Sequence, residues 1–250
     1  MNILLTGATS GIGFELAKLY QSHQLILLAR KPQTVLANTP LANCLYLSCD
    51  LSDSSLNNLE QVKAFLAAQQ IASLDLVIHN AATALFGPSQ LYSNELSARH
   101  LVGLFHTNLY SPITLSYLLL PYLKQAQGKL VFISSTAARL AAPDYAEYAA
   151  SKAAIAAFAR SLRAEGNYRC QVIYPGATQT PIFAKYGINL DSSKFAKVDK
   201  VAKSIHQAIQ QDDLDYIIGL NNYSLTFLAK FFAWPFDRLY SYLRSKPKKG

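Results

Sequence analysis

The chain has 250 residues, of which 51% are hydrophobic and 15% are charged. This composition excludes an intrinsically disordered protein, and the length is enough for one large domain with a substantial core. We expect no membrane-spanning helix, and we expect no signal peptide because the first apolar run begins at Asn2.

The net charge of +8 is unevenly distributed, because the last 14 residues hold five cationic side chains against Asp237 alone. We interpret this segment as a solvated basic tail rather than a nucleic-acid site, since the body of the chain has no aromatic-plus-basic binding motif. The cysteines Cys44, Cys49 and Cys170 lack metal-ligand spacing. They predict reduced core thiols, no metal site and a cytoplasmic location.

Seven short apolar runs predict buried β-strands, with helical spacing between them. The runs are Asn2–Leu5, Leu25–Leu28, Leu45–Leu47, Leu76–Ile78, Leu130–Ile133, Gln171–Tyr174 and Tyr216–Ile218. This alternation predicts an α/β fold, namely a single doubly wound, Rossmann-type domain with a mostly parallel seven-stranded sheet. We expect this domain to cover residues 1–220. Residues 221–250 form an apolar and then basic extension rather than a separate domain.

A glycine-rich turn, TGATSGIG at residues 6–13, follows the first predicted strand and precedes a predicted helix. Gly7 allows a tight turn, while Gly11 and Gly13 allow close approach of backbone to pyrophosphate and of helix to sheet. The helix N-terminus around Ile12 offers N–H groups to phosphates. The turn therefore predicts a dinucleotide site, with an ordinary glycine-containing turn as the alternative.

The residues after the second predicted strand bear on cofactor choice. An acidic residue there would bind a ribose 2′-hydroxyl, but this chain has Arg30 and Lys31. A guanidinium binds a phosphate with paired donors, and Ser10 can add a hydroxyl contact. We therefore predict NADPH/NADP+ in preference to NADH. A solvated basic turn is the alternative.

Tyr148 and Lys152 are spaced by one helical turn, so a phenol and an ammonium share one helix face. A free tyrosine, with a pKa near ~10, holds its proton tightly, and a nearby cation lowers that pKa. We predict Tyr148 as the general acid in carbonyl reduction and the base in alcohol oxidation, with Lys152 tuning it. Ser135 would donate a hydrogen bond to the substrate oxygen. The pair alone would also fit an ordinary amphipathic helix.

With these motifs in this order, the chain resembles the short-chain dehydrogenase/reductase family from residue 2 to about residue 220. The resemblance implies an NAD(P)-dependent oxidoreductase acting on CH–OH and C=O groups, and a homodimer or homotetramer. It implies that Lys152 holds the nicotinamide ribose and that Asn108 holds a water linking Lys152 to solvent. Further cofactor contacts implied by the resemblance are Asp50, Leu51, Asn80, Ala81, Tyr148, Pro175, Gly176, Thr178 and Thr180.

Two residues depart from the family pattern after the fourth predicted strand. His79 stands where the family has an asparagine, and Ala82 stands where it has a glycine. Both departures concern local backbone geometry more than chemistry. We interpret His79 as a hydrogen-bonded structural residue rather than an acid or base.

The expected substrate pocket is apolar, which favours a lipophilic ketone, aldehyde or alcohol. Its candidate residues are Ala141, Ala142, Pro143, Tyr145, Ile182, Phe183, Tyr186 and Ile188. Two alternatives stay open, namely a 3-oxoacyl carrier-protein reductase and a non-catalytic NADPH-sensing protein.

The segment from Tyr223 to Tyr242 is rich in aromatic and aliphatic residues. It could cover the substrate mouth, form an oligomer contact or lie in a membrane interface with the basic tail at the headgroups. Apolar residues on nearly all sides favour burial over a membrane contact. We therefore expect a lid or an oligomer contact.

Overall fold

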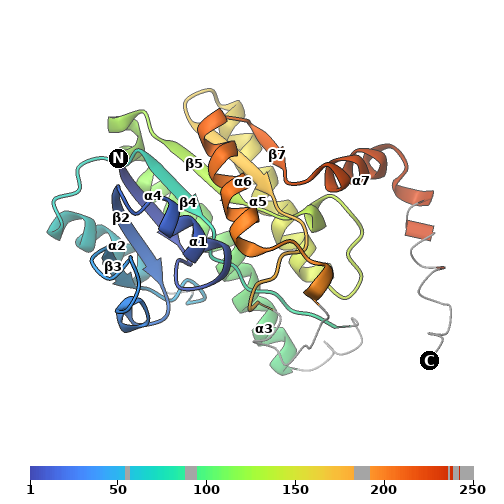
Figure 1. Cartoon of the computed structure of the whole chain (residues 1–250), viewed down its shortest axis with the longest axis horizontal. Coiled ribbons are helices and arrows are strands. Elements are labelled where there is room, and N and C mark those ends of the chain that lie inside the picture. Colours follow the sequence, from blue (N-terminus) through green and yellow to red (C-terminus); the bar gives the residue numbers. More distant parts are fainter. Residues whose placement is uncertain (54–56, 88–94, 183–191, 236, 239–241, 243–250) are drawn as a thin grey trace.

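The structure is a computed structural model that describes residues 1–53, 57–87, 95–182, 192–235, 237–238 and 242. Its centre is one sheet of seven strands (Figure 1). The strands are β1 (Asn2–Thr6), β2 (Gln24–Ala29), β3 (Leu45–Ser48), β4 (Leu76–His79), β5 (Lys129–Ile133), β6 (Arg169–Tyr174) and β7 (Asp215–Ile217). All seven predicted strands are confirmed, with boundaries that differ by one or two residues.

The strand order is β3-β2-β1-β4-β5-β6-β7, and every neighbouring pair is parallel. The predicted α/β class is therefore confirmed, with a wholly rather than mostly parallel sheet. The order reverses at β1, from which the chain first builds outward through β2 and β3 and then returns to β4. Such a switch point leaves a crevice beyond the carboxyl ends of the strands, where ligands of these folds bind.

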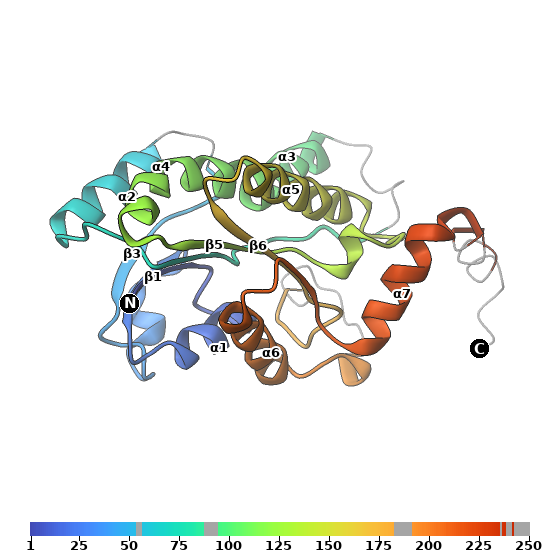
Figure 2. The same cartoon turned by 90° about the horizontal axis from the view of Figure 1, so that it is seen from above.

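Helices cover both faces of the sheet (Figure 2). On one face lie α1 (Gly11–Leu19) and α6 (Val198–Gln211). The other face carries α2 (Asn57–Ala68), α3 (Glu95–Phe105), α4 (Ser111–Ala126) and α5 (Ala146–Ala164). A single π-helical turn, His106–Tyr110, joins α3 to α4.

Each face of the sheet has its own hydrophobic core. Leu4 on β1 packs in the core under α4 and α5, whereas its neighbours Ile3 and Leu5 pack in the core under α1 and α6. Successive side chains of a strand point to opposite faces, so a strand buried on both faces is apolar at most of its positions. This is why the strands read as continuous apolar runs in the sequence.

Helix α7 (Leu220–Phe231) follows β7 and projects from the body of the molecule (Figures 1 and 2). Its large apolar side chains are exposed, including Phe227 and Phe231. These side chains are not buried in the single chain, and the expected lid or oligomer contact stays a prediction. Among the residues that the structure describes, no helix is both long and apolar enough to cross a bilayer.

Candidate active site

A cleft of about 1080 Å³ lies along the carboxyl edge of the sheet. Its walls are formed where β1, β2, β4, β5 and β6 end, together with the start of α1 and the face of α5. All of the site residues predicted from the sequence line this cleft except Gly13 and Asn108. The structure thus brings the glycine turn, the basic pair after β2 and the Tyr148–Lys152 pair into one continuous space.

The glycine turn has the positive φ angles that its glycines predict. Gly7 and Gly11 have φ values of +73° and +58°, in the left-handed region that favours glycine. Gly13 lies inside α1, where an added Cβ would collide with the Gly7 carbonyl oxygen and the Asn80 amide. Gly13 therefore serves the close packing of α1 against the sheet, while Gly7 and Gly11 face the cleft.

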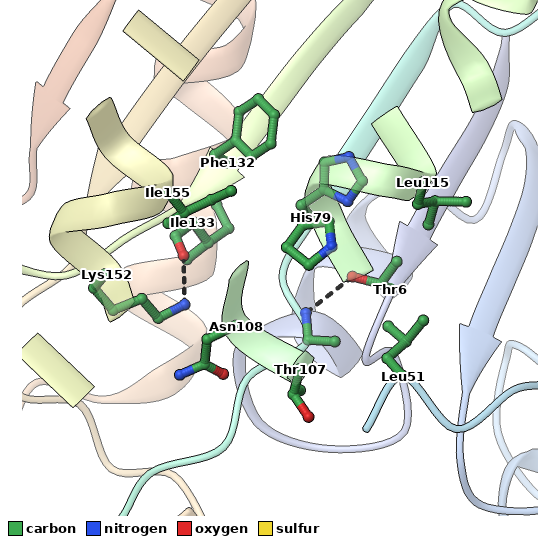
Figure 3. A pocket seen from close by; sticks show the side chains of 12 residues that line it. Thr6, Leu51, His79, Thr107, Asn108, Leu115, Phe132, Ile133, Lys152 and Ile155 are labelled. Carbon is green, nitrogen blue, oxygen red and sulfur yellow. Dashed lines mark hydrogen bonds between the residues drawn. The ribbon is translucent and has the colours of Figure 1, made fainter. Parts of the chain in front are cut away.

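Thr6, which was not predicted as a site residue, joins the two strands that flank the switch point. Its Oγ1 accepts a hydrogen bond from the backbone N–H of Asn80 at 3.0 Å. It accepts a second one from the backbone N–H of Ala81 at 2.9 Å, which is the dashed line at Thr6 in Figure 3. The Asn80 side chain donates in return to the carbonyls of Thr6 and Gly7. A polar residue at the carboxyl end of β1, directly after three apolar residues, is the signal that could have found it.

The residues at the adenosine end of the cleft fit a dinucleotide phosphate. The start of α1 faces the cleft at Ser10 and Gly11, has no acidic residue in its first turn, and Ser10 makes no side-chain cap hydrogen bond. Arg30 and Lys31 are exposed on the cleft wall just beyond β2. Free N–H groups at a helix N-terminus and a nearby guanidinium are the donors that phosphate groups require. The donor set therefore suits a phosphorylated dinucleotide.

Asp50 and Leu51 follow β3 and line the same part of the cleft. The Asp50 carboxylate already accepts two hydrogen bonds from Ser52, from its backbone N–H at 3.0 Å and its hydroxyl at 2.7 Å. These bonds fix the orientation of the Asp50 side chain at the cleft wall.

The catalytic candidates come from α5 and the end of β5. Ser135 Oγ accepts a hydrogen bond from the Ala137 N–H at 3.1 Å, which leaves the hydroxyl proton to be donated. Lys152 is buried, and its Nζ donates to the Ile133 carbonyl at 2.8 Å (Figure 3). Ser134, which was not predicted, donates to the Lys152 carbonyl at 2.9 Å and ties α5 to β5. The relative placement of Ser135 and Lys152 is thus built into the packing.

The proton affinities of the pair differ from the sequence prediction. Burial raises the pKa of Tyr148 to about 12, and a hydrogen bond with Ser135 opposes that rise. Burial lowers the pKa of Lys152 to about 8. The predicted net lowering of the Tyr148 pKa is therefore wrong, because removing the phenolate from water outweighs the nearby favourable interactions.

Asn108 lies outside the cleft, in the π-helical turn between α3 and α4. Its side-chain amide donates to the Thr83 carbonyl at 2.8 Å and to Ser151 Oγ at 3.0 Å, and its Oδ1 accepts from the Thr83 N–H at 2.9 Å. Asn108 also lines a cavity of about 10 Å³ together with Lys152, and the two side chains lie next to each other (Figure 3). That volume is the space of one water molecule.

His79 is buried beside this small cavity, stacked on Phe132 with ring centres 4.9 Å apart. Its Nε2 is 2.9 Å from Ser116 Oγ, and burial lowers the pKa of the imidazole to about 3. The prediction of a hydrogen-bonded structural histidine is confirmed.

The substrate end of the cleft is largely apolar near Tyr148. The predicted residues Ala141, Ala142, Pro143, Tyr145 and Ile182 all line it, and so do Phe86, Leu140 and Phe195, which were not predicted. Phe183, Tyr186 and Ile188 lie outside the described residues.

Comparisons with known proteins agree with this geometry. A family model described as "short chain dehydrogenase" matches residues 1–191. The chain is 28% identical over 222 residues to "11-beta-hydroxysteroid dehydrogenase-like 3" of Arabidopsis thaliana, covering 83% of this chain and 69% of the relative. It is 30% identical over 242 residues to "Dehydrogenase/reductase SDR family protein 7-like" of Drosophila melanogaster, covering 87% of this chain and 72% of the relative.

Among solved structures, the fold resembles a short-chain dehydrogenase from Sphingobium yanoikuyae in complex with NADPH. The TM-score is 0.77 at 22% sequence identity, and the match covers 100% of this chain and 97% of the other. At this identity the likeness establishes the fold.

Proposed function

Because the chain belongs to the short-chain dehydrogenase family, we propose that it is an enzyme that reduces a lipophilic ketone or aldehyde with NADPH, and oxidises the corresponding alcohol in reverse. The observation that carries this proposal is the convergence of Ser135, Tyr148 and Lys152 in one cleft with the glycine turn and Arg30. If Tyr148 and Lys152 were only a structural pair on an amphipathic helix, there would be no reason for phosphate-binding donors to line the same cleft.

We propose that residues at different places along the cleft bind different parts of the cofactor. The α1 N-terminus would hold the pyrophosphate, and Arg30 with Ser10 would hold a ribose 2′-phosphate. Lys152 would hold the nicotinamide ribose. A nicotinamide held there would provide the hydride chemistry of the reaction.

Ser135 and Tyr148 act on the substrate oxygen. The Ser135 hydroxyl donates a hydrogen bond that orients the carbonyl and stabilises the negative charge developing on its oxygen. Tyr148 Oη delivers a proton to that oxygen as the charge appears. With a pKa of about 12, the phenol carries its proton at neutral pH and can donate it.

Tyr148 must recover its proton after each reduction. Lys152 lies beside it, and the cavity between Lys152 and Asn108 has room for one water. We propose that protons return through this water and Lys152, while the hydrogen bonds of Asn108 hold the cavity in shape.

The substrate class is inferred from the apolar wall around Tyr148 and from the relatives. One curated relative is named as a hydroxysteroid dehydrogenase-like protein, and hydroxysteroids are lipophilic alcohols. Both observations favour a lipophilic substrate over a sugar or a charged acid.

The test is a panel of lipophilic aldehydes, ketones and hydroxysteroids, followed by NADPH absorbance, with NADH in parallel. NADPH oxidation that depends on one of these carbonyls supports the proposal. Tight NADPH binding without turnover of any panel member would instead favour a binding protein, and a clear NADH preference would refute the cofactor assignment.

A further inference from the structure

Helix α7 presents its apolar side chains to solvent and its small side chains to the body. Thr226 and Ala229 are buried, whereas Tyr223, Phe227 and Phe231 are 53–63% exposed. These three aromatic residues recur at every fourth position and so form one ridge, in which neighbouring ring centres are 6.4 and 5.2 Å apart. A surface helix of a globular protein normally has the opposite arrangement.

The ridge belongs to a larger surface that we call the α7 patch. Its exposed apolar members are Leu220, Tyr223, Leu225, Phe227, Leu228, Phe231, Phe232 and Trp234. A contiguous exposed apolar surface of this kind marks a binding site for a protein or a membrane.

Cationic side chains accompany the α7 patch. Lys230 lies over the Phe231 ring at 5.8 Å, and the Arg238 guanidinium lies over the Trp234 ring at 4.6 Å. Residues 220–250 contain six lysines or arginines against one aspartate. Tyrosine, tryptophan and basic residues combined with an apolar face are typical of helices that lie at the headgroup level of a bilayer.

We propose that the α7 patch binds the surface of a membrane that contains anionic lipids. The 12 residues of α7 extend about 18 Å at 1.5 Å per residue, whereas the hydrocarbon layer is about 30 Å thick. The helix therefore lies in the plane of the interface, with its aromatic ridge toward the acyl chains and its cations at the headgroups.

Two other occupants fit the observations less well. A two-fold contact between copies would bring two segments of the same strong positive charge together, which costs free energy. A lid would place α7 over the cleft, but none of the residues described for α7 lines it. An anionic surface, in contrast, complements the charge.

The α7 patch is also connected to the cleft. Asn222, in the first turn of α7, donates a hydrogen bond to the Ile218 carbonyl at 2.7 Å. The Asn222 amide also packs directly on Gly176, so that a Cβ added to Gly176 would collide with this amide. Gly176 lines the cleft. If the proposed function holds, membrane-bound α7 keeps the cleft close to the bilayer into which a lipophilic carbonyl partitions.

Co-sedimentation of the full chain with vesicles tests the proposal without substrate or cofactor. One set of vesicles is phosphatidylcholine and the other adds phosphatidylserine. We expect binding to the anionic vesicles that weakens at high salt. The double variant F227S/F231S should lose at least about tenfold in partition coefficient, because two buried rings are removed.

The matched control is V35S/L214S, which removes two exposed apolar side chains outside the α7 patch and should bind as the wild type does. Y148F should bind vesicles as the wild type does, because the catalytic tyrosine has no part in membrane binding. A failure of the catalytic proposal can therefore be told apart from a failure of the membrane proposal. Circular dichroism melting verifies that each variant is folded. Absence of vesicle binding, or equal binding by F227S/F231S, would overturn the proposal. Self-association that F227S/F231S abolishes, without vesicle binding, would assign the patch to a second copy instead.

Discussion

The Nζ of Lys152 lies 5.8 Å from the centre of the Tyr148 ring, one turn along the same helix. Burial acts on both groups in the same sense, since it disfavours the phenolate and the ammonium alike. Burial therefore favours a neutral phenol as proton donor, beside an ammonium that gives up its own proton more readily than a free lysine.

Replacing Tyr148 with phenylalanine should abolish carbonyl reduction while sparing the cofactor site. The variant removes the only group in the proposed mechanism that delivers a proton to the substrate oxygen, so we expect a loss in kcat of about 10²- to 10⁴-fold. NADPH binding, measured by fluorescence titration, should be unchanged. Y145F is the matched control, because its ring centre lies 6.2 Å from that of Tyr148 in the same cleft. A wild-type rate in Y148F would refute the mechanism.

The pH dependence of reduction should report Lys152. Its lowered pKa means that the ammonium is present below pH 8 and is lost as the pH rises through about 8. Without that charge Tyr148 is a weaker acid, so kcat/KM, which reports the free enzyme, should fall there. K152R keeps its charge over this range and should lose the transition. A wild-type profile that stays flat to pH 10 would contradict this assignment.

Replacing Arg30 with alanine should weaken NADPH binding selectively. Loss of a charge-assisted contact to a 2′-phosphate predicts an increase of about tenfold or more in the Kd for NADPH. The Kd for NADH, which lacks that phosphate, should not change. Isothermal titration with both cofactors measures the difference. K63A, an exposed lysine on α2 outside the cleft, is the control. An equal effect of R30A on both cofactors would rule out the phosphate contact.

The strands and the position of the cleft could be predicted because their signals are local. A strand buried on both faces carries an apolar run, such as Leu130–Ile133 in β5, and a positive φ just after β1 favours glycine, here Gly7. The parallel order then places all the strand ends at one edge. For this reason, residues distant in sequence could be assigned to a single site.

The features that were not predicted depend on contacts between distant segments. Thr6 and Ser134 hold site residues through hydrogen bonds to chain segments 18 to 75 residues away. The raised pKa of Tyr148 follows from its surroundings in the cleft rather than from its spacing to Lys152. The exposure of Phe227 depends on which face of α7 packs on the body. The spacing of residues along the sequence does not reveal these contacts between distant segments.

Gly13→Ala should destabilise the fold, because its Cβ would collide with the Gly7 carbonyl and the Asn80 amide. Overpacking at a rigid backbone contact typically costs about 1–3 kcal/mol. The control is Gly103→Ala, since an added Cβ at this glycine inside α3 meets nothing within 4 Å. Alanine is a better helix former than glycine by about 0.5–1 kcal/mol, so this variant should be as stable as the wild type or more so. Urea unfolding measures both, and equal stability of the two variants would contradict the packing role of Gly13.

His79 should make the stability of the protein depend on pH. Burial lowers its pKa from 6.5 to about 3, so between these values the unfolded chain binds a proton that the folded chain excludes. The unfolded state is then favoured as the pH falls, and stability declines through this window. Between pH 7 and pH 5 the contribution of one such histidine is about 2 kcal/mol.

The measurement is the free energy of unfolding in urea at pH 7 and pH 5 for the wild type and H79N. An asparagine does not titrate, so the difference between the two pH values should shrink by about 2 kcal/mol in the variant. H100N, which replaces an exposed histidine, controls for the loss of a histidine elsewhere and should keep the wild-type difference. Because H79N also alters the contact with Ser116, its absolute stability is expected to change at both pH values. The difference between the two pH values, rather than either value alone, therefore decides the question, and an unchanged difference in H79N would show that His79 is protonated in the folded chain.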